Sequence, residues 1–248
     1  MIRIVVPMGG EGRQFAERGY TFPKPLVEVA GQPLIELVVR NLTPREPHEF
    51  VFVCRAEHVQ RYALADVLAL VAPGCHVVTM AKPTAGALCS VLLALEHLGD
   101  DDELLIANAD QWIDQPVDRF LAAARESEWD GGLMTFPNTH PRWSYARTEG
   151  DEVVAVAEKQ PISRNATVGI YYFRRGRDFV AAAERMLFKN ASVAGEFYVA
   201  PVFNELVLAG SRVGHYPIDG SQMHGLGTPE EVERFQARAN ATPREVSC

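Results

Sequence analysis

The sequence predicts an α/β fold whose central sheet is mostly parallel and carries helices on both faces. In the first half of the chain, short uninterrupted apolar runs alternate with longer segments whose apolar residues recur at helical spacing. Uninterrupted apolar runs are typical of strands buried on both faces, and short connections between strands and helices favour parallel pairing. Hydrophobic residues make up 47% of the 248 residues, which is enough for an ordinary globular core.

The elements of the first half follow one another in a regular order. The expected strands are 2–6, 50–54, 76–80 and 104–107, and the expected helices are 32–42, 57–71 and 87–98. Proline ends the first two helices, at Pro44 and at Pro73. Because ligands of such sheets bind beyond the carboxyl ends of the strands, the segments that follow 2–6 and 104–107 are expected to meet at one site.

The second half is less regular. Its expected strands are 130–136, 152–157, 167–173 and 213–218, with an irregular loop over 137–147 and a helix over 177–187. A final helix is expected from Thr228, since Thr at the N-cap, Pro229 in the first turn and the acids Glu230 and Glu231 suit a helix N-terminus. No linker or repeat divides the chain, so we expect one domain over 1–248 that frays from about Ala241.

Charge and cysteine usage narrow the function classes. The chain carries 24 Lys and Arg against 32 Asp and Glu, and the net charge of −8 disfavours non-specific binding to nucleic acid. No apolar stretch approaches the roughly 18–20 residues of a membrane span, and the apolar start is too short for a signal peptide. The cysteines form no metal-binding or redox spacing; they are Cys54, Cys75, Cys89 and Cys248. We therefore expect a cytoplasmic protein that acts on a small molecule, without nucleic-acid or membrane partners.

A glycine-rich loop follows the first expected strand. Gly9, Gly10 and Gly12 would let backbone N–H groups approach phosphate oxygens, because glycine has no side chain and tolerates positive φ. The loop matches neither GxGxxG nor a Walker P-loop, so by itself it fits a tight strand–helix turn equally well. Lys24 favours the phosphate interpretation, because the prolines on either side stiffen the backbone around a positive charge close to the loop.

Asp110 comes shortly after the expected strand 104–107, at the same edge of the sheet as the glycine loop. Mg²⁺ in nucleotide sites prefers one or two carboxylates together with phosphate oxygens and water. Taken alone, Asp110 would be interpreted as a turn or cap residue. Together with Lys24 and the glycines, it is the expected ligand of Mg²⁺, which is the cofactor that the sequence predicts.

Further motifs follow in order along nearly the whole chain. After GGEGRQF and TFPKPLVEVAGQPLI come TAGALCSVL (84–92), NADQ (108–111), EKQP (158–161), TVGIYYF (167–173), GEFYVAP (195–201) and GLGTPEEV (225–232). With these motifs the chain resembles the nucleotidyltransferase superfamily that includes the sugar-1-phosphate nucleotidylyltransferases, or NDP-sugar pyrophosphorylases, as a short single-domain member. Several ordered motifs are more specific than any one of them.

The resemblance implies a Rossmann-like (GT-A-like) three-layer sandwich with a mostly parallel, mixed central sheet. It implies transfer of a nucleoside monophosphate from a triphosphate to a phosphorylated small molecule, usually a sugar 1-phosphate, with release of pyrophosphate and dependence on Mg²⁺. Residues 1–130 would bind the nucleotide and 131–240 the acceptor. Such enzymes serve NDP-sugar synthesis, including capsule and surface polysaccharides. Short members commonly form dimers, which leaves a homodimer open, although no stretch identifies an interface.

Matched motif by motif, the resemblance assigns roles to individual residues. The expected catalytic residues are Arg13, Lys24, Asp110 and Lys159, of which Asp110 would hold the metal. The expected nucleotide-binding residues are Met8, Gly9, Gly10, Gly12, Gly86, Asn108 and Ala109. The expected acceptor-binding residues are Glu158, Gly169, Glu196, Tyr198 and His224. The Tyr198 side chain is open to a second interpretation as a core aromatic, and His224 to one as a loop histidine.

Three departures from the family pattern leave the substrates open. Gln14 stands where the loop arginine is expected, with Arg13 one place earlier, and Ala81 stands near the place of a base-reading glutamine. Gly225 stands where the second metal aspartate is expected, so either Asp110 supplies the one contact or Asp219 or His224 compensates. In the expected loop 137–147, Arg142 and Trp143 either close over a substrate or only pack.

Two other functions remain alternatives. A glycosyltransferase of similar nucleotide-binding architecture usually carries a D-x-D motif, of which Asn108-Ala-Asp110 supplies only the second aspartate. A non-catalytic nucleotide-binding module would bind triphosphates without releasing pyrophosphate. The intact Lys24 and Lys159 motifs favour the nucleotidyltransferase.

Overall fold

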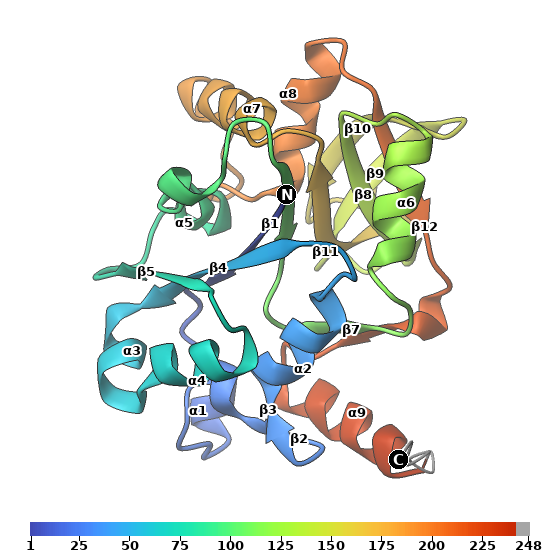
Figure 1. The fold of residues 1–248 in the computed structure, drawn as a ribbon. Coiled ribbons are helices and arrows are strands. Elements are labelled where there is room, and N and C mark those ends of the chain that lie inside the picture. Colours follow the sequence, from blue (N-terminus) through green and yellow to red (C-terminus); the bar gives the residue numbers. More distant parts are fainter. Residues whose placement is uncertain (242–248) are drawn as a thin grey trace.

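A single nine-stranded sheet organises the computed structural model, which describes residues 1–241. Its order is β5-β4-β1-β6-β11-β8-β12-β10-β9 (Figure 1). The strands are β1 (Ile2–Met8), β4 (His48–Arg55), β5 (His76–Met80), β6 (Glu103–Ala107), β8 (Gly131–Pro137), β9 (Ser144–Glu149), β10 (Glu152–Glu158), β11 (Asn165–Phe173) and β12 (Val213–Pro217). Strands β5, β4, β1 and β6 run parallel, and β11 enters antiparallel beside β6. The predicted mixed sheet with a parallel first half is confirmed.

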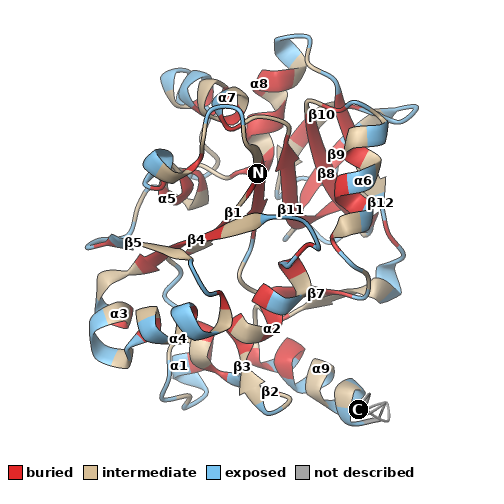
Figure 2. Ribbon diagram, viewed as in Figure 1, coloured by how far each residue is buried: buried red, intermediate tan, exposed pale blue. Residues whose placement is uncertain are grey.

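Helices cover both faces of the sheet. Alternate residues of β1 face opposite cores: Ile4 and Val6 belong to one apolar cluster and Val5 to the other, and all three are fully buried. The first cluster receives α2 (Leu34–Leu42), α4 (Leu64–Val71), α6 (Asp118–Glu126) and α9 (Pro229–Ala241). The second receives α5 (Ala87–Leu92), α7 (Gly176–Phe188) and α8 (Phe203–Leu208). The result is the predicted three-layer arrangement, with buried residues concentrated in the sheet (Figure 2).

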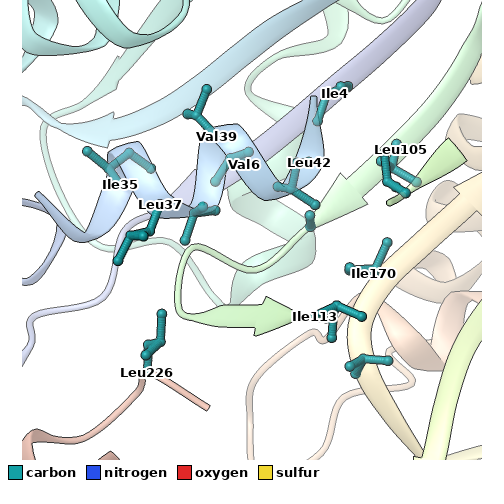
Figure 3. Close-up of a cluster of buried hydrophobic side chains, with 14 of the residues drawn as sticks. Ile4, Val6, Ile35, Leu37, Val39, Leu42, Leu105, Ile113, Ile170 and Leu226 are labelled. Carbon is teal, nitrogen blue, oxygen red and sulfur yellow. The ribbon is translucent and has the colours of Figure 1, made fainter. Parts of the chain in front are cut away.

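Helix α2 shows how sequence periodicity becomes packing. Its buried positions include Ile35, Leu37, Val39 and Leu42, and its amphipathic stripe lies over β1 (Figure 3). The predicted helix 32–42 starts two residues late, because Gln32–Pro33 forms the short strand β3 against β2 (Glu28–Val29). Burying such a stripe removes apolar surface from water, which contributes about 25 cal/mol for each Å².

Two predicted helices are shorter than expected. The segment predicted as one helix over 57–71 contains α3 (Ala56–Tyr62) and α4, separated by Ala63 at φ 49°. The break allows Leu64 and Leu68 to reach the core with no exposure. The helix predicted over 87–98 ends at Leu92 and continues as the 3₁₀ turn η2 (Leu95–His97). Neither break carries a glycine or proline, so local sequence gave no signal.

The segment 137–147 is also more regular than predicted. Only the part before residue 144 is a loop, since β9 begins there and pairs antiparallel with β10. The short helix α1 (Arg13–Glu17) and helices α6 and α8 were not predicted either.

None of the helices of residues 1–241 combines the length and apolarity required to cross a membrane. The fraying that the sequence predicts from about Ala241 falls on residues outside the described range, and so does Cys248.

Two short strands bring distant motifs together. Strand β7 (Gln111–Ile113) pairs antiparallel with β13 (Met223–Gly225), and the N–H of Leu226 donates to the carbonyl of Asp110 at 2.7 Å. The NADQ motif therefore lies directly beside the GLGTP motif. Because α9 begins at Pro229, its N-terminus is held at the same edge of the sheet as Asp110.

Candidate active site

Two adjoining cavities lie at the carboxyl ends of β1 and β6. The first, which we call the glycine-loop cavity, has a volume of 620 Å³ and is lined by residues 9–13 and by the segment around Gly86. The second, which we call the Lys24 cavity, has a volume of 450 Å³ and includes Lys24, Asp110 and Lys159 in its lining. Pro7, Gly10 and Ala87 line both. Ligands in the two cavities would therefore meet at the glycine loop.

The glycine loop is shaped by close packing on one side and open space on the other. A Cβ at Gly9 would lie 2.2 Å from Cε of Met80, so only glycine fits without moving that side chain. At Gly10, an added Cβ would meet nothing within 4 Å, which leaves room for a ligand. Gly12 has φ 62° and begins α1 in the left-handed conformation, for which glycine is favoured.

Lys24 and Asp110 form an ion pair at the edge of the sheet. Nζ of Lys24 lies 2.5 Å from Oδ2 of Asp110, and the two side chains are 21% and 34% exposed. Lys24 begins the 3₁₀ turn η1 (Lys24–Leu26), and its Cβ lies 3.3 Å from the position of a Cβ at Gly12. The structure therefore brings together the glycine loop, Lys24 and Asp110, which the sequence predicted to form one site.

The donor set at Asp110 fits Mg²⁺ in one coordination mode. Within residues 1–241, no three His, Cys, Asp or Glu side chains converge on a point, so a metal cage made of protein ligands alone is absent from this part of the chain. Mg²⁺ bound mainly by phosphates and water needs only one or two carboxylates. Asp110 can supply one, provided that Lys24 exchanges its carboxylate partner for a phosphate.

The candidates for a second metal ligand lie elsewhere. His224 Nε2 is 2.9 Å from Oδ2 of Asp114 and also contacts Arg238, and it does not line the Lys24 cavity. Asp219 caps the turn η4 (Gly220–Gln222) by accepting from the N–H of Ser221 at 2.8 Å. The structure therefore does not bring His224 or Asp219 to Asp110.

Glu231 occupies the space beside Gly225 instead. A Cβ at Gly225 would lie 2.8 Å from Oε1 of Glu231, and Glu231 is only 8% exposed. Oε2 accepts from the N–H groups of Gly227 at 2.9 Å and Thr228 at 3.1 Å, as in a capping box, and Oε1 accepts from Nη2 of Arg142 at 2.5 Å. Its carboxylate is thus already engaged. The T-P-E-E sequence predicted Glu231 in the first turn of this helix but neither its capping contacts nor its place in the cavity wall.

Glu158 and Lys159 enter the Lys24 cavity from the end of β10. Burial raises the pKa of Glu158, and Ser144 donates a hydrogen bond to its carboxylate. Lys159 has φ 55°, a conformation that costs energy in a residue with a side chain and that clusters at functional sites. Its Nζ donates to the hydroxyl of Tyr198 at 2.5 Å, which raises the pKa of Lys159, and Tyr198 in turn donates to Glu196.

The glycines predicted to contact ligands also allow parts of the protein to approach each other. At Gly86, where φ is 116°, a Cβ would lie 2.4 Å from the carbonyl oxygen of Phe197. Phe197 donates to Ala85 at 2.7 Å and accepts from the N–H of Leu88 at 3.0 Å. At Gly169, where φ is 87°, a Cβ would lie 2.3 Å from Nδ2 of Asn108. These contacts join residues 1–130 to residues 131–240.

The predicted site residues divide between the two cavities except for His224, which lines neither. Met8, Gly10, Lys24, Asn108, Ala109, Asp110, Glu158, Lys159, Gly169 and Tyr198 line the Lys24 cavity. Gly9, Gly10, Gly12, Arg13, Gly86 and Glu196 line the glycine-loop cavity. Lining residues that the sequence did not assign include Gln111, Ser144, Thr167, Tyr171 and Glu231. Local sequence carries little signal for them, because a polar residue in a strand or in the first turn of a helix is ordinary until its neighbours are known.

Comparisons with known proteins agree with this arrangement. Residues 4–187 match the MobA-like NTP transferase domain. The fold is similar to that of the nucleoside-diphosphate-sugar pyrophosphorylase from Vibrio cholerae RC9, with 26% identity, a TM-score of 0.80 and coverage of 96% of this chain and 100% of that one. No significant match was found among curated proteins.

Two further solved structures share the fold at lower identity. The inositol-1-phosphate CTP transferase from T. maritima has 15% identity and a TM-score of 0.75, covering 99% of this chain and 98% of its own. The UDP-glucose pyrophosphorylase from Acinetobacter baumannii has 17% identity and a TM-score of 0.73, covering 99% and 96%. At these identities the likeness concerns the fold alone. Since the family match itself spans most of the sequence, the chain belongs to the MobA-like NTP transferase domain family and is a nucleotidyltransferase.

Proposed function

We propose that this protein transfers a nucleoside monophosphate from a nucleoside triphosphate to a sugar 1-phosphate, with Mg²⁺ and with release of pyrophosphate. The observation that carries the proposal is the Lys24–Asp110 pair beside two adjoining cavities. A triphosphate and a phosphorylated acceptor each require a cavity, and their reacting phosphates must meet. The shared lining at Gly10 supplies that meeting point.

In this proposal the triphosphate lies along the glycine loop, where the open side of Gly10 leaves space for its oxygens. Lys24 exchanges Asp110 for a phosphate, which would free the Asp110 carboxylate to hold Mg²⁺. When bound there, the ion would neutralise charge on the triphosphate. Lys159 binds the acceptor phosphate, whose oxygen attacks the α-phosphorus as the bond to pyrophosphate breaks. The side chains hold the reactants in line and compensate charge, which are the main contributions of protein to phosphoryl transfer.

The surroundings of the Lys24 cavity support direct transfer to a polyhydroxylated acceptor. Neither cavity is lined by a cysteine of residues 1–241, and burial raises the pKa of Cys54 to about 12, so no cysteine of this part of the chain is placed to act as a thiolate nucleophile. Glu158 and Ser144 can bind sugar hydroxyls. The buried Nε2 of Gln111 has no hydrogen-bond acceptor within residues 1–241, which leaves it a donor for a hydroxyl.

The activity is tested by pyrophosphate release. We expect at least one pair drawn from CTP, UTP, GTP, dTTP or ATP and a panel of sugar 1-phosphates to release pyrophosphate with Mg²⁺. Nucleotide binding without pyrophosphate from any pair would instead support a binding module. Sugar transfer from a nucleotide sugar, without consumption of a triphosphate, would support a glycosyltransferase.

Tyr198→Phe tests the positioning of Lys159. The variant keeps the ring, whose centroid lies 4.7 Å from Nζ of Lys159, and removes the hydroxyl that receives its hydrogen bond. We expect the KM for the acceptor to rise about threefold to tenfold with a smaller change in kcat, as for loss of one hydrogen bond of typical strength. Tyr62→Phe is the matched control, since Tyr62 lines neither cavity. A fall in kcat at constant KM would contradict the positioning role.

A further inference from the structure

A third cavity adjoins the Lys24 cavity on the side of helix α9. It has a volume of 370 Å³, and we call it the α9 cavity. Both cavities are lined by Arg142, Trp143, Met223, Gly225 and Glu231. The two cavities therefore adjoin along these five residues.

Basic side chains dominate the lining of the α9 cavity. It contains Arg142, Arg234, Arg238 and His224 against the single acid Glu231. Helix α9 contributes a continuous face, because residues 231, 234, 235 and 238 recur at the spacing that places side chains on one side of a helix. The sequence predicted this helix, but the proposed nucleotidyl transfer uses none of its arginines.

The carboxylate of Glu231 is committed to other partners. It accepts two backbone N–H groups at the start of α9 and one N–H of Arg142. Its role toward Arg142 is to fix the guanidinium, which also stacks at 4.4 Å over the ring of Trp143. Arg142 is thus held in place in the wall between the two cavities, although its side chain is 46% exposed. A guanidinium carries five N–H donors, so one bond to Glu231 leaves others for a ligand.

The other basic groups differ in their partners. Asp114 lies 2.6 Å from Nη2 of Arg238 and 2.9 Å from Nε2 of His224, which fixes both. Arg234 has no carboxylate within ion-pair distance in the described part of the chain, and its Nε donates to the backbone carbonyl of Glu230. Arg142 and Arg234 are therefore the two groups best placed to bind an added anion.

We propose that the α9 cavity binds a second anionic group of the acceptor, a carboxylate or a phosphate, so that acceptors charged at both ends are preferred. This inference rests on the proposed function and specifies its substrate class. The first phosphate is bound by Lys159, as in the proposed reaction, and the second group is bound by Arg142 and Arg234. Guanidinium groups suit both anions, because their planar donors match two oxygens at once.

Matched acceptors test the proposal. Glucose 1-phosphate has one anionic group, whereas glucuronic acid 1-phosphate adds a carboxylate and glucose 1,6-bisphosphate adds a phosphate. We expect kcat/KM to be at least about tenfold higher for one of the doubly charged compounds, the gain expected from charged hydrogen bonds. Which of the two is preferred identifies the second group. Equal kcat/KM for all three compounds would overturn the proposal.

Variants assign the preference to the cavity. Arg142→Met and Arg234→Met are each expected to reduce the ratio of kcat/KM between the doubly and singly charged acceptors by about tenfold. Arg147→Met on β9 is the matched control, because Arg147 is exposed and lines none of the three cavities. An unchanged ratio in both cavity variants would place the preference elsewhere and contradict the assignment.

Calorimetry separates this inference from the proposed activity. Binding of the three acceptors is measured directly, with and without nucleotide, and needs no turnover. If no pair releases pyrophosphate but the doubly charged compounds still bind about tenfold more tightly, the proposed activity is contradicted and the α9 site is supported. If pyrophosphate is released and all three acceptors bind equally, the proposed activity is supported and the α9 site is contradicted.

Discussion

Asp110→Asn is expected to lower the rate of pyrophosphate release at least about a hundredfold, since metal-held charge compensation contributes several kcal/mol to the transition state. The amide keeps the shape of the carboxylate but cannot neutralise Lys24, which lies 2.5 Å away, or bind Mg²⁺ strongly. Asp101→Asn is the matched control, because Asp101 is 75% exposed and pairs with Arg177 on the surface. Its rate is expected to equal that of the unmodified protein.

A second measurement follows the metal rather than the turnover. Mn²⁺ replaces Mg²⁺ in many phosphate sites, and its binding is followed by electron paramagnetic resonance. With a nonhydrolysable triphosphate present, we expect Asp110→Asn to bind Mn²⁺ more weakly and Asp101→Asn to bind it normally. Normal Mn²⁺ affinity and a normal rate in Asp110→Asn would remove Asp110 from the site.

Gly86→Ala is expected to destabilise the fold by about 2 to 4 kcal/mol, because the new Cβ clashes with backbone at a strained φ. The methyl would lie 2.4 Å from the oxygen of Phe197, and backbone atoms cannot yield as a flexible side chain does. The shift would separate segment 84–88 from residues 195–198 and displace Glu196 and Tyr198. We therefore expect pyrophosphate release to be nearly abolished as well.

Gly74→Ala is the matched control for this variant. Gly74 also has positive φ, at 82°, but a Cβ there would meet nothing within 4 Å. It isolates the conformational cost, about 1 kcal/mol, from the clash. Urea denaturation measures both variants. Equal losses of stability in the two would show that the contact between Gly86 and Phe197 does not constrain the fold.

Local sequence signals predicted the strands of the parallel half of the sheet. The predicted strand 2–6 lies within β1, which is central and therefore apolar along most of its length. Strand 76–80 has the bounds that the sequence predicts, although β5 is an edge strand and only Met80 in it is buried. Local signals failed where a distant contact decided the conformation. Ala63 takes a left-handed conformation that no local residue type requires, and β9 forms because β10 supplies its hydrogen bonds.

The sequence by itself determined the fold class, the glycine loop and the expectation that Lys24 and Asp110 belong to one site. Glycine conformation, stiff proline flanks and apolar strands are local properties that residue order records directly. Only the tertiary structure decided that His224 contacts Asp114 and that Glu231 binds Arg142 beside the Lys24 cavity. Those partners are separated by 110 and 89 positions in the chain, and which charges meet over such separations depends on how sheet and helices pack.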